Sequence, residues 1–235
     1  MTTADGPRGA DGWTAAVRQR LGLGRLLPLG GPADGAWISE RAAVTVLRGV
    51  VAGPGPGPGP VLGELRISVA DPDGAPDAEV EPPPSALPPG PLRIEATMSA
   101  VSGQPLPAAA EALRSALLTA ASQRLGLVVA TVDVRVTELL DTPPERPAPV
   151  PAEVRGARAE GVAATAAAGV PGVVTLTRVL GHAVHTGPDR VRVELATDPG
   201  HRALDVARAV RGAVANAVEG HPSVAVLVTA VVERG

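Results

Sequence analysis

The same order of secondary-structure patterns, helix, strand, strand, helix and strand, occurs twice along this chain of 235 residues. In the first half, helical spacing of apolar residues covers 39–51 and 106–126, and strand-like alternation covers 63–69, 91–98 and 131–139. Ser39 is placed to cap the first of these helices. A chain of this length that repeats one order of elements is long enough for two cores of ordinary size.

The second half repeats that order. Its helical patterns cover 152–168 and 201–220, and its strand patterns cover 172–181, 189–197 and 223–233. Two short matches give the expected alignment of the halves: LRIE at 92–95 with VRVE at 191–194, and VTE at 136–138 with VVE at 231–233. A repeat at the level of elements indicates two copies of one small domain.

The predicted fold is α+β: two tandem α-β-β-α-β domains, each a small three-stranded sheet with helices packed on one face. In each copy the first two strands pair as an antiparallel hairpin, and the following helix returns the chain so that the third strand joins the same sheet. The other sheet face stays open, either to solvent or to a partner. We expect this open face to carry Arg93, Glu95, Arg192 and Glu194.

Stretches rich in Pro and Gly separate these parts. The alternating Gly-Pro tract at 53–60 predicts a loop, and the acidic, Pro-rich stretch at 71–90 has so little to bury that it predicts a mobile hairpin loop. Prolines from Asp141 onward favour extended backbone and predict a stiff linker. The predicted organisation is an N-terminal tail with a short amphipathic helix at 1–35, a first domain at 36–140, a Pro-rich linker at 141–151 and a second domain at 152–235.

The N-terminal segment has a short helical pattern that should end before Gly24. A Trp and aliphatic residues beside arginines suit either an interfacial helix on anionic lipid or, as the favoured interpretation, a helix that docks onto its own first domain or onto a partner subunit. The residues predicted to make this partner or membrane contact are Trp13, Val17, Arg18, Arg20, Leu21 and Arg25.

The second copy resembles the alkaline-shock protein family, the general-stress and envelope-stress proteins of Gram-positive bacteria. The resemblance lies in Pro171-Gly172-Val173, which leads from a helix into a strand, and in the Val-alternating strands that follow. The first copy has Gly59-Pro60-Val61 at the matching place. The resemblance implies a cytoplasmic, non-enzymatic protein that associates with homologous subunits or with itself, or gathers beneath the membrane through a separate anchor protein.

Composition excludes several classes of function. The chain has no Cys and no Lys, since all 21 of its basic residues are Arg, so disulfides, thiolate nucleophiles, Schiff-base catalysis and a phosphate-loop lysine are unavailable. The net charge of −3 disfavours a generic polyanion binder. We also expect neither an export signal nor a membrane span, because the chain lacks a basic start followed by an apolar run and any run of about 18 apolar residues.

Catalytic, cofactor and metal sites are not expected. The motif His182-x-x-His185 lies in a predicted strand end and turn, where the two rings would converge poorly, and zinc needs three or four protein ligands. None of the serines lies in a GxSxG-type motif that would mark a nucleophile. The acidic residues of the strands fit a solvated sheet face better than a pair of catalytic carboxylates. We therefore expect no small-molecule substrate.

A KH-like nucleic-acid-binding module is the alternative hypothesis. The element order is similar to part of a type II KH domain, and 169–172 reads GVPG, a GxxG motif. In KH domains that loop joins two helices, whereas here it joins a helix to a strand. No basic patch or aromatic platform accompanies it, so nucleic acid is not the expected partner.

Overall fold

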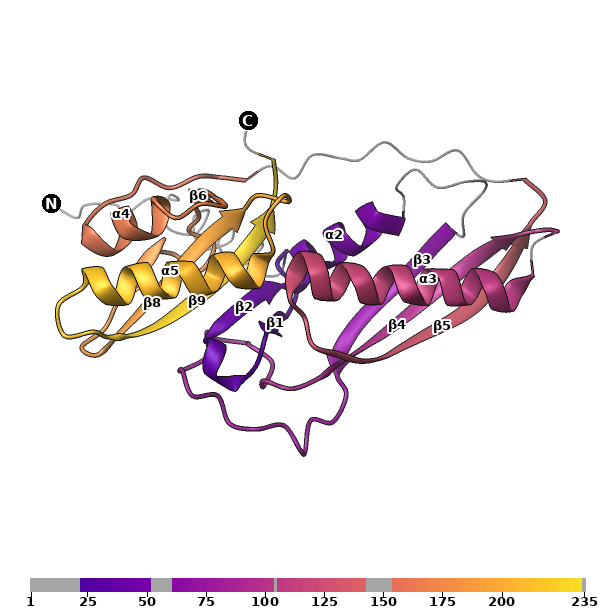
Figure 1. Ribbon diagram of the computed structural model, residues 1–235, viewed down its shortest axis with the longest axis horizontal. Coiled ribbons are helices and arrows are strands. Elements are labelled where there is room, and N and C mark those ends of the chain that lie inside the picture. The colour runs from indigo at the N-terminus through magenta and orange to yellow at the C-terminus, as the bar shows by residue number, and fades with distance from the viewer. Residues whose placement is uncertain (1–21, 52–60, 104, 143–153, 234–235) are drawn as a thin grey trace, which may run out of the picture.

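The computed structural model contains helices and strands mixed along the chain, which form one sheet of three strands and one of six (Figure 1). This confirms the predicted α+β class. The structure describes residues 22–51, 61–103, 105–142 and 154–233. The helix predicted around Trp13, the Gly-Pro tract and most of the Pro-rich linker lie outside these residues.

The first unit, residues 40–140, has the predicted order of elements. Strand β3 pairs antiparallel with β4, and β4 pairs parallel with β5, with α2 and α3 on one face of the sheet. Ser39 caps α2 as predicted, because its Oγ accepts a hydrogen bond from the Ala42 amide at 3.2 Å. The elements are α2 (Glu40–Val51), β3 (Val61–Val69), β4 (Leu92–Val101), α3 (Leu106–Ala120), the π-helical turn η2 (Ala121–Leu125) and β5 (Val129–Leu140).

The second unit repeats the connectivity of the first. Strand β6 pairs antiparallel with β8, and β8 pairs parallel with β9, while α4 and α5 accompany this sheet. The helix predicted over 152–168 is limited to 162–168, and the strand predicted over 172–181 stops at 176, where the chain leaves the sheet edge. The elements are α4 (Val162–Ala168), β6 (Val173–Leu176), β7 (Val184–Thr186), β8 (Arg190–Thr197), α5 (Ala203–Ala217) and β9 (Ser223–Val231).

The expectation of a three-stranded sheet is wrong for the second unit. Two strands that the sequence patterns did not reveal, β1 (Leu26–Leu29) and β2 (Ala36–Ser39), form a hairpin on it. The hairpin encloses the short 3₁₀ helix η1 (Pro32–Asp34), and β2 pairs parallel with β9. From residue 22 onward, the chain therefore contributes first to the sheet of the second unit and enters the first unit only at α2, so residue 36 does not mark a boundary between the units.

The β-bulges of the two sheets fix how the units correspond. In the first unit the register shifts between Val136 and Glu138 of β5, and in the second it shifts between Val228 and Ala230 of β9. Val136 therefore corresponds to Val228, and not to Val231 as the short sequence match indicated. Aligning 92–95 with 191–194 is likewise wrong, by two residues, because a strand with period-two alternation fits equally well when it slides by two positions.

One hydrophobic core joins the units. A single cluster of buried side chains includes Met98 and Leu117 of the first unit as well as Leu195 and Val210 of the second. At the junction, the Gly30 amide donates a hydrogen bond to the Gly126 carbonyl at 3.0 Å. The two units therefore form one continuous body.

The acidic segment between β3 and β4 forms a strap across the outer face of the six-stranded sheet. The prediction that it buries almost nothing is wrong, because Val80 is only 7% exposed. The Leu87 amide donates to the Leu26 carbonyl at 2.9 Å, and Glu81 forms an ion pair with Arg190 of β8. Val80, the apolar contacts of Ala86 and Leu87, a backbone hydrogen bond and this ion pair together hold the strap on the second unit.

Candidate interaction surface

The outer face of the six-stranded sheet is covered by the chain itself. Trp37, Ala225 and Leu227 point to this face and pack in a small second core with Leu26 and Val80. The apolar side chains on β9 explain why this face is buried, since exposing them would forfeit their hydrophobic stabilisation.

The prediction that Arg192 and Glu194 lie on an open face is wrong for this reason. Glu194 is completely buried, and its Oε2 accepts a hydrogen bond from the Leu180 amide at 2.9 Å. Leu180 belongs to the loop after β6, which folds over the sheet at this point. The Arg192 guanidinium lies 3.7 Å from Glu194 and is itself mostly buried, so the pair stabilises the loop and does not face solvent.

The outer face of the three-stranded sheet is open, as predicted for the first unit. Arg93 and Glu95 are exposed on β4, and Asp133 and Arg135 are exposed on β5. Arg93 Nε lies 3.6 Å from Asp133 Oδ2, and both side chains remain about half exposed. These four side chains form what we call the charged face.

The two units differ at the outer edge of their last strand. In the second unit, Arg211 of α5 donates to the Val224 carbonyl at 3.0 Å, and the next outward group, the Val226 amide, donates to Gly35 at the start of β2. In the first unit, Arg114 of α3 donates to the Val132 carbonyl, also at 3.0 Å.

The edges match up to this point, but β5 then has no further strand beside it within the described residues. Figure 1 shows β5 as an outer strand of its sheet, with β2 beside β9 in the other. The first unit therefore has an open strand edge where the second has a filled one.

Sequence reasoning missed this pair of arginines, although a signal for it exists. Residues 113–117 read LRSAL and residues 210–214 read VRGAV, which place an Arg at the same point of the two corresponding helices. The strands β1 and β2 gave no such signal, because each has four residues and all are buried, so no alternation marks them.

Arg25 is the one predicted contact residue that the structure describes, and it binds within the protein. Its guanidinium donates to the Glu40 carboxylate at 2.9 Å and to the Ile67 carbonyl, which links the start of β1 to α2 and β3. Burial opposes the charge of Glu40 most strongly, but the hydrogen bonds and charge of Arg25 outweigh it and lower the pKa of that carboxyl. Trp13, Val17, Arg18, Arg20 and Leu21 lie outside the described residues.

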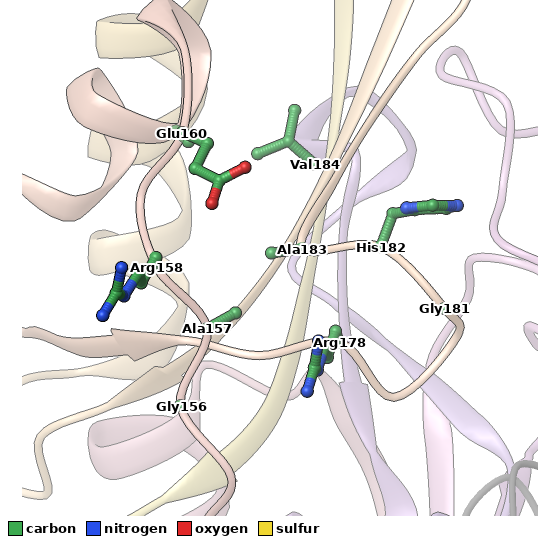
Figure 2. Close-up of a pocket in the computed structure, with 10 residues that line it drawn as sticks. Gly156, Ala157, Arg158, Glu160, Arg178, Gly181, His182, Ala183 and Val184 are labelled. Carbon is green, nitrogen blue, oxygen red and sulfur yellow. The ribbon is translucent and has the colours of Figure 1, made fainter. Parts of the chain in front are cut away.

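A pocket of about 490 Å³ lies beside the loop that covers Glu194, and Figure 2 shows its lining. Glu160 points toward Val184 across the pocket, whereas the side chains of Arg158, Arg178 and His182 lie apart at separate places on the lining. General acid–base or nucleophilic chemistry needs such groups within hydrogen-bond reach of each other or of a substrate. The arrangement brings no two of these side chains together for that purpose.

The histidines and the GVPG loop occupy ordinary structural positions. His182 lies in the turn before β7 and His185 within β7, and within the described ranges no group of three His, Cys, Asp or Glu residues is arranged to hold a metal ion. Gly172 has a φ of +88°, and a Cβ there would lie 2.6 Å from Val206, so close packing against α5 sets the conformation of this loop.

No protein-family model, curated protein or solved structure matches the chain. None of the helices in the described parts combines the length and the apolar character needed to cross a bilayer.

Proposed function

We propose that this protein is a non-enzymatic assembly protein that binds other protein subunits through the sheet of its first unit. The observation that carries the proposal is the contrast between the units. The strand edge and the sheet face that β2 and the strap cover in the second unit are left open in the first by every part of the chain that the structure describes.

Physical chemistry favours a protein partner for such a surface. An open edge presents unpaired N–H and C=O groups that bind another strand readily, and proteins normally shorten, bend or cover such edges. On the charged face, Arg93, Glu95, Asp133 and Arg135 alternate in sign along two neighbouring strands. Mixed charge of this kind suits a protein surface of complementary pattern better than the uniform negative charge of nucleic acid.

The partner classes follow the resemblance to alkaline-shock proteins. They are homologous subunits or further copies of this chain, with a small membrane anchor protein as a second class. A location in the cytoplasm, gathered at the inner face of the membrane through that anchor, belongs to the same proposal.

Light scattering after size exclusion tests the proposal, with the chain alone from about 1 to about 300 µM and then co-expressed with homologues. We expect a mass that rises with concentration or with the homologue. Glu95→Arg should weaken binding of a homologue that covers the charged face, whereas Glu160→Arg at the pocket, on the second unit, should not. A chain that stays monomeric throughout, and binds neither homologues nor anionic vesicles, would contradict the proposal.

A further inference from the structure

The outer edge of β5 is complementary to itself. We propose that β5 pairs antiparallel with β5 of a second copy of this chain, with Val134 opposite Val134 at a two-fold axis. The inference rests on the proposed function, because it names one partner and one contact for that function. It is carried by the regular stretch of β5 and by the order of its charges.

Some backbone N–H and C=O groups of β5 point away from β4 and are available for pairing. The Val132 carbonyl points away from β4, because it meets Arg114. Successive residues of a strand point their backbone groups to alternate sides, so those of Val134 and Val136 point outward as well. In β9 the corresponding Val226 amide binds the neighbouring strand while Arg211 stays on the Val224 carbonyl, so an arginine at this place leaves the residues beyond it available for pairing. By the same pattern, Arg114 keeps the Val132 carbonyl, and the outward groups of Val134 and Val136 and the Val132 amide are available to a second strand.

Two bulges limit the segment of β5 that can pair with another strand. The register between β4 and β5 shifts at both ends, between Val129 and Thr131 and between Val136 and Glu138. Bulges bend a strand and interrupt regular pairing, so the straight part of β5 is 131–136. A second β5 related by a two-fold axis normal to the sheet must match within this stretch.

Two-fold symmetry and the charges of β5 fix the register between the two copies. Such an axis keeps each side chain on its own sheet face, so opposing residues differ by an even number of positions. Centring the pair on Asp133 or Arg135 places two like charges opposite each other, which destabilises the pair. Centring on Val134 instead places Asp133 opposite Arg135 of the second copy, twice by symmetry.

The same register also satisfies the inner face. Val132 of one copy opposes Val136 of the other, and the two Val134 side chains meet at the axis. All three belong to the side of β5 that packs toward the helices. The product is one continuous six-stranded sheet with the helices of both copies on one face and the charged faces of both on the other.

The contact is small, because one short strand pair lies at the low end of known interface areas. We therefore expect a dimer that forms at about 10–100 µM, and not at nanomolar concentration. Reversing one of the two charges turns both attractive cross-strand pairs into repulsive ones, which should weaken the dimer roughly 10- to 100-fold.

Charge-reversal variants of the full chain test the register by sedimentation velocity. Asp133→Arg and Arg135→Asp should each be monomeric alone, whereas their mixture should form a heterodimer at least as tight as the wild-type dimer. The double variant, in which the two charges are exchanged, should recover the homodimer. Glu160→Arg, an exposed charge reversal on the second unit far from β5, is the control and should dimerise as the wild type does.

Cysteine pairing gives a second readout, which is clean because the chain has no Cys. Asp133→Cys and Arg135→Cys variants, mixed and oxidised, should form a disulfide-linked dimer much faster than either variant alone, because residues directly opposite lie within disulfide reach.

The outcomes separate this inference from the proposed function. If the wild type associates but the variants behave like it and the mixture gains nothing, the β5 pairing is wrong while the assembly function stands. If the wild type stays monomeric but binds homologues, the pairing is again wrong and the assembly function survives. A monomer that binds no subunit at all overturns both.

Discussion

Gly126 ends the π-helical turn after α3 at the point where the two units meet. It adopts φ of +89°, and a Cβ on it would lie only 2.4 Å from Cβ of Leu204 in α5. Gly126→Ala should therefore destabilise the whole chain, because an L-residue disfavours this backbone conformation and the methyl group overlaps the second unit.

The expected magnitude follows from these two terms. The left-handed conformation costs an alanine about 1–2 kcal/mol, and the overlap adds about 1–3 kcal/mol because α5 must shift. Gly103 has nearly the same φ, +90°, but nothing within 4 Å of its Cβ position, so Gly103→Ala should show the first term alone. The difference between these variants measures the contact between the units.

Urea denaturation provides the assay. Far-UV circular dichroism follows the helices of both units, and Trp37 fluorescence follows the second, in a background where Trp13→Leu removes the other tryptophan. Because one core joins the units, both probes should show a single coincident transition, shifted further by Gly126→Ala than by Gly103→Ala. Two separate transitions, or equal shifts, would refute the shared core.

Three further perturbations have expected outcomes. Arg208→Gln removes the bidentate ion pair to Asp34 that lowers the pKa of that carboxyl, so it should cost about 0.5–1 kcal/mol near pH 7. This cost should shrink as the pH falls below the ordinary carboxyl pKa and vanish below the lowered folded-state pKa of Asp34, because protonation of the carboxyl removes the ion pair; urea midpoints against pH measure it. Val80→Asp should release the strap, seen as faster limited proteolysis within 71–91, while Val80→Ala should have a smaller effect. Glu40→Gln should lower the free energy of unfolding by about 1–2 kcal/mol, because it weakens the hydrogen bonds from Arg25. Unchanged thermal stability would show that the Arg25–Glu40 contact is unimportant.

The elements that the sequence predicted are those with a long periodic pattern. The strand pattern at 131–139 and the helical pattern at 106–126 match β5 and α3 with its π-helical turn, because many side chains repeat one period there. The hairpin of β1 and β2 could not be found in this way, since its short strands are buried on both sides. Residues of β2 pair with residues of β9 that lie 190 positions further along the chain, and no local pattern reports so distant a pairing.

The candidate surface was predicted only in part, for a related reason. Alternation correctly placed Arg93 and Glu95 on an outer sheet face, but it could not say what else would cover that face in the other unit. Glu194 has the same alternating context and is nevertheless buried, because the loop containing Leu180 supplies an amide to its carboxylate. Coverage is a property of tertiary structure, and a strand pattern reports only which side chains share a face.

A comparison of β5 with β9 relates the covering of the outer sheet face to the residues that lie on it. Asp133 and Arg135 of β5 correspond to Ala225 and Leu227 of β9, because the bulges match Val136 with Val228 and therefore Val132 with Val224. Where the chain places Ala and Leu, its own strap and Trp37 cover the face, and β2 fills the edge. Where it places a carboxylate and a guanidinium, covering by an apolar strap would cost the desolvation of both charges, whereas the proposed second copy would supply the opposite charge at each position. These two positions therefore differ between the units as coverage does: they are apolar where the chain covers its own sheet, and charged where we propose that a second copy pairs.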